Sequence, residues 1–250
     1  MTAFIRPRPL VVPAVRLIGF HHAGGSAASY FPMSRHLPAD WDIALLELPG
    51  RGKRAADVPL RGMAAVIGRA LADLEPLRDA PVALFGHSMG AIVAWEVARA
   101  WSAAGSPPLW VGLSGRLPPG WPNARRGLHR LGDAALLAVL DDLGGVPEWL
   151  ADNPAFRDRF LRLVRADLAA VESYHPTGFQ APLDCPLTVY GGAGDRWAAP
   201  AAMAAWSART TGPFAHHVFP GGHFYFAGDA LPGFAARLAC DVTKVMAMAA

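Results

Sequence analysis

The stretch PVALFGHSMGAIVAWEVARA, residues 81–100, holds the strongest fold signal in this chain. Its first part, 81–87, is a short apolar run, typical of a strand that is covered on both faces. The turn GHSMG follows at 86–90, and the helix-favouring segment 91–105 ends at a glycine that is soon followed by a proline. This strand, turn and helix form a nucleophile-elbow pattern, in which a sharp turn lifts the hydroxyl of Ser88 above the sheet. The pentapeptide alone also fits a glycine-rich turn with a passive serine, but its flanks favour a nucleophile.

Further short apolar runs alternate with helical patterns along the chain. The other strand candidates are 14–20, 42–48, 109–115, 187–192 and 216–221, and a helical pattern at 63–78 lies between two of them. Strands separated by crossover helices predict an α/β fold with a mostly parallel, doubly wound sheet. At 250 residues, we expect a single domain spanning 1–250.

The alternation lapses between Arg116 and Pro182. Two helical patterns occupy this interval, at 133–143 and 154–174, and we interpret it as a helical lid insertion at about 116–182 rather than a second domain. One face of the second helix carries apolar residues at helical spacing, namely Phe156, Phe160, Leu163, Val164, Leu168 and Val171. Asp167 and Tyr174 share that face. They would either line a substrate channel or fix the lid through a core hydrogen bond, and we favour the second interpretation.

Composition excludes several classes of function. The formal charge is +3 and no run is rich in Lys and Arg, so we expect no nucleic-acid partner. We expect no membrane span, because no stretch of eighteen residues is free of charge and proline, and no signal peptide, because prolines interrupt residues 1–16. Cys185 and Cys240 are isolated in the sequence, which favours a reducing cytoplasm.

A serine nucleophile needs a base to take its proton and an acid to orient that base. In this type of fold the chain order is serine, acid, histidine. Asp195 follows the strand candidate 187–192, and His223 follows the candidate 216–221. Both therefore come at carboxyl ends of strands, where open α/β sheets place their sites. We predict Asp195 as the acid and His223 as the base.

The rival residues are less well placed. His216 and His217 start the last strand candidate, and Asp184 precedes its strand, so all three would lie at the far end of the sheet. His129 and His175 belong to the lid, and a mobile lid is a poor support for a catalytic base.

Four segments together resemble one family. FHHAGGSAASYF (20–31), LELPGRGKR (46–54), GHSMGAIVAWEVA (86–98) and GGHFYF (221–226) are similar to segments of the stand-alone type II thioesterases of nonribosomal peptide and polyketide synthesis, which belong to the α/β-hydrolase superfamily. The resemblance runs from about Leu17 to the C-terminal helix. It implies an enzyme that hydrolyses acyl or aminoacyl thioesters on the phosphopantetheine arm of a carrier protein. Such enzymes edit misprimed or stalled carriers, and some release products.

The resemblance also implies roles for single residues. Ser88 would be the nucleophile, Asp195 the orienting acid and His223 the base, while the backbone N–H groups of Ala23 and Met89 would form the oxyanion hole. The sequence departs from the family at His21, where proline is common, and at Arg196-Trp197 after the acid, where smaller aliphatic residues are usual. No catalytic group is lost by either departure.

The loop FHHAGGSAASY, residues 20–30, fits this assignment better than two alternatives. A metal site would need a third ligand near His21 and His22, and a phosphate cradle would need a GK[ST] or GxGxxG pattern. With Ser88 assigned, the loop instead supplies the Ala23 amide to the oxyanion. We then expect His22 to fix the loop by a hydrogen bond.

The resemblance implies acyl or peptidyl carrier proteins as partners, no resident cofactor or metal, and a monomer. Arginines of the lid could receive an acidic carrier, although a merely solvated face explains them equally well; these are Arg125, Arg126, Arg130, Arg157, Arg162 and Arg165. Two other functions remain open. A carboxylesterase for a small soluble ester would use the same triad, and a hydrolase-fold binding protein would use none.

Overall fold

A computed structural model describes residues 3–121, 127–146, 150, 153–176 and 181–249. Its centre is a seven-stranded sheet in the order β1-β3-β2-β4-β5-β6-β7. The strands are β1 (Phe4–Ile5), β2 (Val15–Phe20), β3 (Trp41–Leu46), β4 (Val82–His87), β5 (Trp110–Ser114), β6 (Leu187–Gly192) and β7 (Phe214–Phe219). All neighbours pair in parallel except β1, which is antiparallel to β3. The predicted mostly parallel, doubly wound sheet is confirmed.

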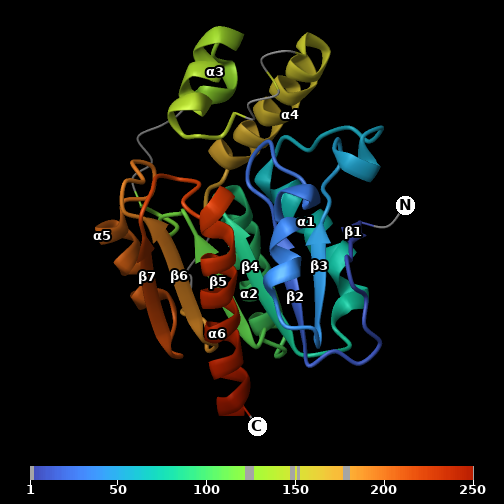
Figure 1. The fold of residues 1–250 in the computed structure, drawn as a ribbon, viewed down its shortest axis with the longest axis vertical. Helices are drawn as coiled ribbons and strands as arrows, with labels where there is room; N and C mark the ends of the chain where they lie inside the picture. The colour runs from blue at the N-terminus through green and yellow to red at the C-terminus, as the bar shows by residue number, and fades with distance from the viewer. Residues whose placement is uncertain (1–2, 122–126, 147–149, 151–152, 177–180, 250) are drawn as a thin grey trace.

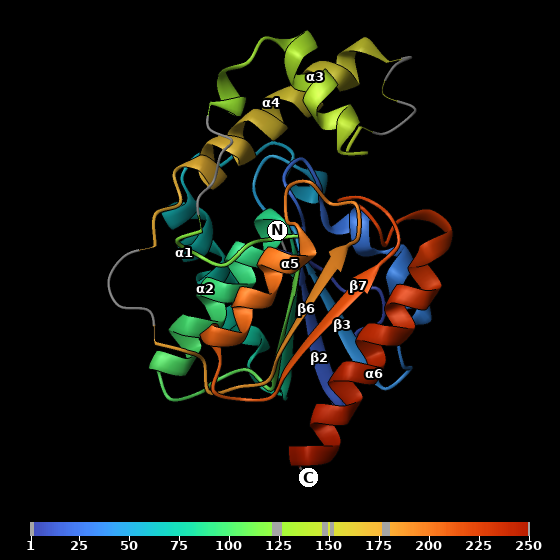
Figure 2. The same cartoon turned by 90° about the vertical axis from the view of Figure 1, so that its left-hand side faces the viewer.

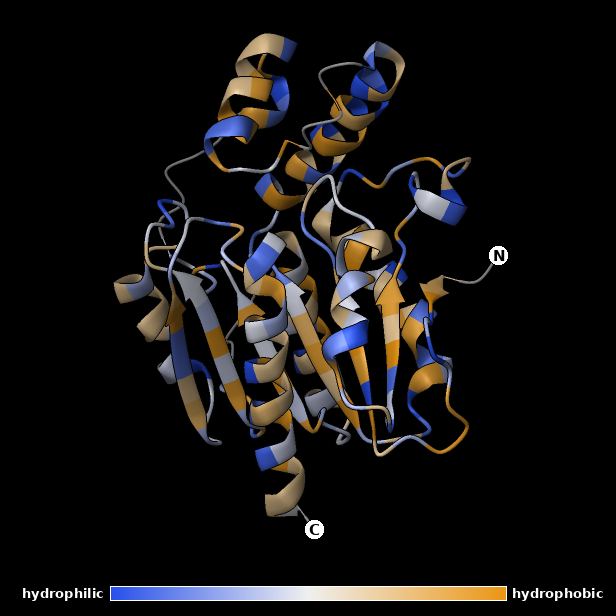
Figure 3. Cartoon of the chain, in the orientation of Figure 1, coloured by the Kyte–Doolittle hydropathy of each residue, from blue (hydrophilic) through white to orange (hydrophobic). Residues whose placement is uncertain are grey.

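Helices cover both faces of the sheet, which explains why the strands from β2 to β6 are apolar at nearly every position. One face packs against α1 (Met63–Leu74), α2 (Met89–Ala103) and the short α5 (Pro200–Met203). The other packs against α6 (Leu231–Ala249) and two 3-10 turns, η1 (Ala27–Tyr30) and η2 (Pro32–His36). Figure 2 shows these two layers, and Figure 3 shows the hydrophobic strands between them.

Two details differ from the sequence-based prediction. β1 is only two residues long, too short to give a periodic pattern. β7 begins at Phe214 rather than at His216, because Phe214 pairs with Leu187 of β6. His216 and His217 therefore lie in the middle of β7, and the prediction that they start the strand is wrong. His217 contacts Asp241 of α6, with Nε2 3.1 Å from Oδ2.

The lid lies above the carboxyl ends of the strands, as Figure 1 shows. We define it as η5 (Leu128–Arg130), α3 (Asp133–Asp142) and α4 (Pro154–Glu172), which occur between β5 and β6. α3 and α4 share a small core of their own, made by Leu136, Leu140, Leu161, Val164 and Leu168.

The apolar face of α4 is shifted from the prediction. Leu161 is buried, whereas Phe156 is 53% exposed. Phe156 lies in the first turn of α4, at the end of that helix that projects away from the sheet (Figure 1). None of the helices in the described ranges is long and apolar enough to cross a membrane.

Candidate active site

Ser88 occupies a strained turn between β4 and α2. Its backbone angles are φ 56° and ψ −109°, and it is the sole non-glycine residue of the described chain with a positive φ. A Cβ at Gly86 would lie 2.1 Å from the Gly90 carbonyl oxygen, and a Cβ at Gly90 would lie 1.9 Å from the Phe20 carbonyl oxygen. Backbone crowding therefore requires both glycines, as the sequence predicts.

The Ser88 side chain makes no hydrogen bond to the helix that it caps. Ser88 is the N-cap residue of α2, a position where serine side chains commonly bond a helix amide, yet its side chain makes no capping bond. Its amide donates to the Ser114 carbonyl oxygen of the neighbouring β5 at 2.8 Å, which fixes the backbone of the turn. The residue is half-buried at the carboxyl end of the sheet.

Asp195 and His223 form a buried pair. The Nδ1 atom of His223 lies 2.8 Å from Oδ2 of Asp195, and the residues are 5% and 3% exposed. The other carboxylate oxygen, Oδ1, accepts the amides of Trp197 at 2.8 Å and Ala198 at 3.1 Å. Burial alone would raise the pKa of Asp195, but the hydrogen bond and charge of His223 and the two amides outweigh it and lower that pKa. An ionised Asp195 accepts a hydrogen bond from Nδ1–H of His223, which leaves Nε2 of the imidazole for a substrate or nucleophile.

His223 lies beside the residue that precedes Ser88. Its ring centroid is 4.6 Å from that of His87. A Cβ at Gly115, directly after β5, would lie 3.1 Å from Cε1 of His223, so glycine permits this close approach. The fold thus brings the carboxyl ends of β4, β5, β6 and β7 together around Ser88, Asp195 and His223.

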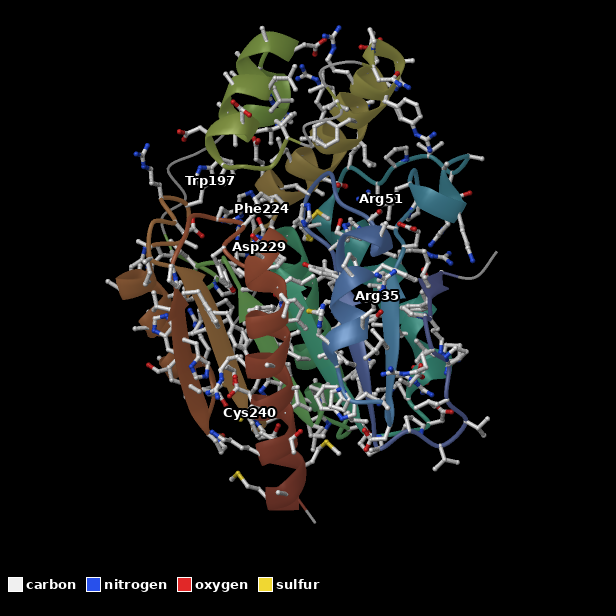
Figure 4. The ribbon with its side chains drawn as sticks, in the orientation of Figure 1. Arg35, Arg51, Trp197, Phe224, Asp229 and Cys240 are labelled. Atoms are coloured by element: carbon white, nitrogen blue, oxygen red, sulfur yellow. The ribbon has the colours of Figure 1, made fainter. Side chains whose placement is uncertain are left out.

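Phe224 is a site residue that the sequence reasoning did not single out. Its ring lies 4.8 Å from His22, 5.3 Å from His223 and 5.3 Å from His87. Figure 4 shows it together with Trp197 beneath α3, and Trp197 lies 5.9 Å from His223 between ring centroids. The aromatic rings wall off the base from solvent. The available signal was position alone, since Phe224 directly follows His223.

The departure at Arg196-Trp197 has a visible effect. The Trp197 ring forms part of the wall beside His223, and its amide holds Asp195. Arg196 is exposed and reaches Asp142 at the end of α3, with Nη1 3.9 Å from Oδ1. Arg196 therefore connects the acid-bearing loop to the lid.

The loop after β2 brings the Ala23 amide toward the Ser88 turn. Within the described residues, neither the Ala23 amide nor the Met89 amide donates a hydrogen bond to a protein acceptor. The following amides are engaged, since Gly24 N–H donates to Oδ2 of Asp167 at 2.7 Å and Gly25 N–H donates to the His22 carbonyl at 3.0 Å. β2 pairs with β4, which brings this loop next to the Ser88 turn.

The two adjacent histidines are uncharged at neutral pH. Burial and the nearby charge of Arg51 lower the pKa of His21 well below its usual range, while burial and the charges of His223 and Arg51 lower the pKa of His22 to about 3. The expected loop-fixing bond is made by His21, whose Nδ1 donates to the His22 carbonyl at 2.8 Å. The assignment of that role to His22 is therefore wrong, because the His22 ring packs against Phe224 instead. Across the described ranges, no group of three or more His, Cys, Asp or Glu side chains is placed to hold a metal.

The polar residues of the lid are largely held within the fold. Asp167 pairs with Arg51, and the Tyr174 hydroxyl donates to Glu96 of α2, which agrees with core hydrogen bonds that fix the lid. Nδ1 of His129 lies 2.9 Å from Oε2 of Glu172, so this ring is held by a partner within the lid. No pattern in the sequence indicates that Arg51 and Asp167, far apart in the chain, would meet.

The lid arginines differ in whether they are bonded within the lid. Arg165 bonds the carbonyls of His129 and Leu131 and the carboxylate of Asp133, so it stabilises the lid itself. Arg162 is exposed, while Arg125 and Arg126 lie outside the described residues.

The chain is similar to known thioesterases in sequence and in fold. A family model for thioesterase domains matches residues 15–239. The chain is 31% identical over 212 residues to the gramicidin S biosynthesis protein GrsT of Aneurinibacillus migulanus, covering 84% of this chain and 82% of GrsT. It is 36% identical over 228 residues to thioesterase PikA5 of Streptomyces venezuelae, covering 88% and 78% of the two chains. Among solved structures, YbtT, a type II thioesterase from the yersiniabactin NRPS/PKS pathway, superposes with a TM-score of 0.85 at 29% identity, covering 98% of this chain and 99% of YbtT.

Proposed function

The chain belongs to the thioesterase domain family, and we propose that it hydrolyses acyl and aminoacyl thioesters held on the phosphopantetheine arm of carrier proteins. It is a thioester hydrolase similar to the stand-alone type II thioesterases of peptide and polyketide synthesis. The observation that carries the mechanism is the unengaged Ser88 hydroxyl on its strained turn, beside the buried Asp195–His223 pair. In the cell, this activity would edit misprimed or stalled carriers or release a product.

The proposed reaction has two stages. Oγ of Ser88 attacks the thioester carbonyl while Nε2 of His223 takes its proton. The tetrahedral intermediate then collapses, and the phosphopantetheine sulfur leaves as the thiol with the proton from His223. In the second stage His223 activates a water molecule, which attacks the acyl-serine and releases the free acid and Ser88. Asp195 stabilises the imidazolium that forms in both stages.

Two amides are proposed to hold the negative oxygen of each intermediate. The Met89 N–H starts α2, where the unpaired amides and the helix dipole favour an anion. The Ala23 N–H would supply the second donor from the loop after β2. Removal of one such donor typically costs about 100- to 1,000-fold in kcat.

The substrate partner is proposed to be an acyl or peptidyl carrier protein. GrsT is a gramicidin S biosynthesis protein and YbtT comes from an NRPS/PKS pathway, which supports a carrier-bound substrate. The proposed steps call on no resident metal or cofactor, and we propose that the enzyme acts as a monomer in the cytoplasm.

A direct test uses a carrier protein loaded with acetyl- or aminoacyl-phosphopantetheine, with release of the acid measured by mass spectrometry of the carrier. The wild-type protein should unload the carrier, and Ser88→Ala should reduce the rate by about a million-fold, to background. Ser207→Ala, which changes an exposed serine of η7 (Ala204–Arg209), is the matched control and should keep wild-type activity.

Three results would count against the proposal. Turnover of p-nitrophenyl esters with no unloading of the carrier would indicate a carboxylesterase. Turnover of neither would indicate a binding protein. Unloading by Ser88→Ala at the wild-type rate would remove Ser88 as the nucleophile.

A further inference from the structure

A buried ion pair joins the lid to the body of the protein directly behind the proposed oxyanion loop. Arg51, which follows β3, donates from Nη2 to Oδ1 of Asp167 at 2.8 Å and from Nη1 to Oδ2 at 2.8 Å. Asp167 belongs to α4, so the bidentate contact crosses between lid and body. The two side chains are 3% and 1% exposed. Figure 4 shows Arg51 in the layer between the strand ends and the lid.

The same pair also binds the backbone of the loop. Oδ2 of Asp167 accepts the Gly24 amide at 2.7 Å, and Nη1 of Arg51 donates to the Gly25 carbonyl at 3.0 Å. Gly24 directly follows Ala23, whose amide is the proposed oxyanion donor. The peptide unit after that donor is therefore fixed by a lid carboxylate, and the carbonyl of Gly25, two residues after Ala23, is fixed by an arginine.

Packing reinforces this arrangement. Gly24 has φ +76°, and a Cβ there would lie 2.5 Å from Cγ2 of Val164 in α4. Ala23 packs against the apolar core of the lid. The loop thus rests on α4 at the point where Asp167 binds it, and the position of α4 determines the position of the Ala23 amide.

From this geometry we propose that Arg51 and Asp167 are positioning residues for thioester hydrolysis, which hold the oxyanion loop in its productive conformation and make it depend on a correctly seated lid helix. The inference rests on the proposed function, because it assigns the two residues to the oxyanion loop of that reaction. Neither residue is proposed to touch the substrate. Their loss should act on the transition state, since a displacement of about 1 Å at a catalytic group can cost about 100-fold in rate.

A second buried Arg–Asp pair supplies the matched control. Arg16 and Asp42 are 2% and 0% exposed, with Nε 2.6 Å from Oδ2, but they lie at the amino ends of β2 and β3, at the opposite end of the sheet. Asp42→Asn therefore removes a buried charge of the same kind without touching the oxyanion loop.

The test compares Asp167→Asn, Arg51→Lys and Asp42→Asn in steady-state kinetics with a loaded carrier, after far-UV circular dichroism has shown each to be folded. Asp167→Asn and Arg51→Lys should each lower kcat by about 100-fold with KM within about twofold, because the lost contact serves the transition state. The double variant should lose little more than either single one, because the residues act as a unit. Asp42→Asn should keep kcat within about twofold of the wild type.

A binding measurement separates positioning from a merely structural role. A trifluoromethyl ketone analogue of acyl-pantetheine forms a tetrahedral adduct with Ser88, and its affinity should fall in parallel with kcat in Asp167→Asn and Arg51→Lys. The affinity of a thioether analogue, which cannot react, should stay unchanged. The inference is overturned if both variants keep the wild-type kcat, or if KM rises alone.

Should Asp167→Asn fail to fold, Arg51→Lys carries the test by the same criteria. Failure of the proposed function would look different, because the wild-type protein itself would then leave the carrier loaded.

Discussion

The two ends of the central sheet are built on different principles. At the amino end, Asp42 is completely buried and accepts from both Arg6 and Arg16, with Arg6 Nη2 at 2.7 Å from Oδ2. Arg16 in turn bonds the Leu77 carbonyl at 2.8 Å and the carboxylate of Asp79. At the carboxyl end, by contrast, a strained serine lies among buried, uncharged histidines, and His21 Nε2, His22 Nδ1 and His87 Nε2 are each without a hydrogen-bond partner among the described residues.

This difference indicates that the amino end of the sheet contributes mainly to stability and the carboxyl end mainly to activity. At the amino end, removal of one partner from a buried pair should destabilise the fold, because it strands the other charge. Strain and unsatisfied polar atoms at the carboxyl end cost stability, and they are tolerated where chemistry needs them. Perturbations at the carboxyl end should therefore change activity most, and perturbations at the amino end should change stability most.

The largest expected effect follows from Asp195→Asn at the carboxyl end. The amide cannot hold His223 in the tautomer that leaves Nε2 free to accept a proton, so kcat should fall by about 10,000-fold. Stopped-flow or quenched assays with a loaded carrier would measure this. The free energy of unfolding, from urea titration, should change far less than it does in Asp42→Ala at the amino end. A decrease in kcat below tenfold would show that another group orients the base.

The next effect is expected from Asp42→Ala at the amino end. This change leaves Arg16 buried without its main carboxylate, which should destabilise the protein by about 3–5 kcal/mol. Urea or guanidinium unfolding monitored by tryptophan fluorescence would measure the loss. The kcat of the folded fraction should remain that of the wild type. A large decrease in kcat at unchanged stability would break the division between the two ends.

The smallest effect concerns pH. Burial lowers the pKa of His21, His22 and His87 in the folded protein, with nearby positive charge as the second cause, so the unfolded chain binds their protons first. The stability from these neutral rings is complete above about pH 6.5, and it decreases as the pH falls toward the folded pKa, which for His22 is about 3. Each ring should contribute about 1.4 kcal/mol per pH unit well below pH 6.5.

Unfolding titrations between pH 5.5 and pH 4 would measure that slope. His22→Phe, which keeps an aromatic ring against Phe224, should reduce the slope by about 1.4 kcal/mol per pH unit. At the amino end, the hydrogen bond from Arg16 lowers the pKa of Asp79, so its contribution is present above the usual carboxyl range and lost only at lower pH. An unchanged slope in His22→Phe would show that the ring accepts a proton in the folded state.

The sequence was sufficient for features that depend on local pattern. The strands from β2 to β6 follow apolar runs, and Ser88, Asp195 and His223 follow from one motif and the order of groups along the chain. It was insufficient where distant segments meet. Arg51 and Asp167 are 116 residues apart, and no periodicity links them. The roles of His21 and His22 depend on which ring turns toward Phe224, which two adjacent identical residues cannot reveal.

The missing side chain at Gly24 has a consequence for the height of the lid. Because Val164 approaches the place where a Cβ would stand to 2.5 Å, α4 rests almost directly on the main chain of the loop. At this contact, the distance between α4 and the loop after β2 is therefore set by the backbone of Gly24. Glycine at position 24 therefore allows α4 to pack this closely, and a larger residue there would push the lid helix away from the loop that carries the Ala23 amide.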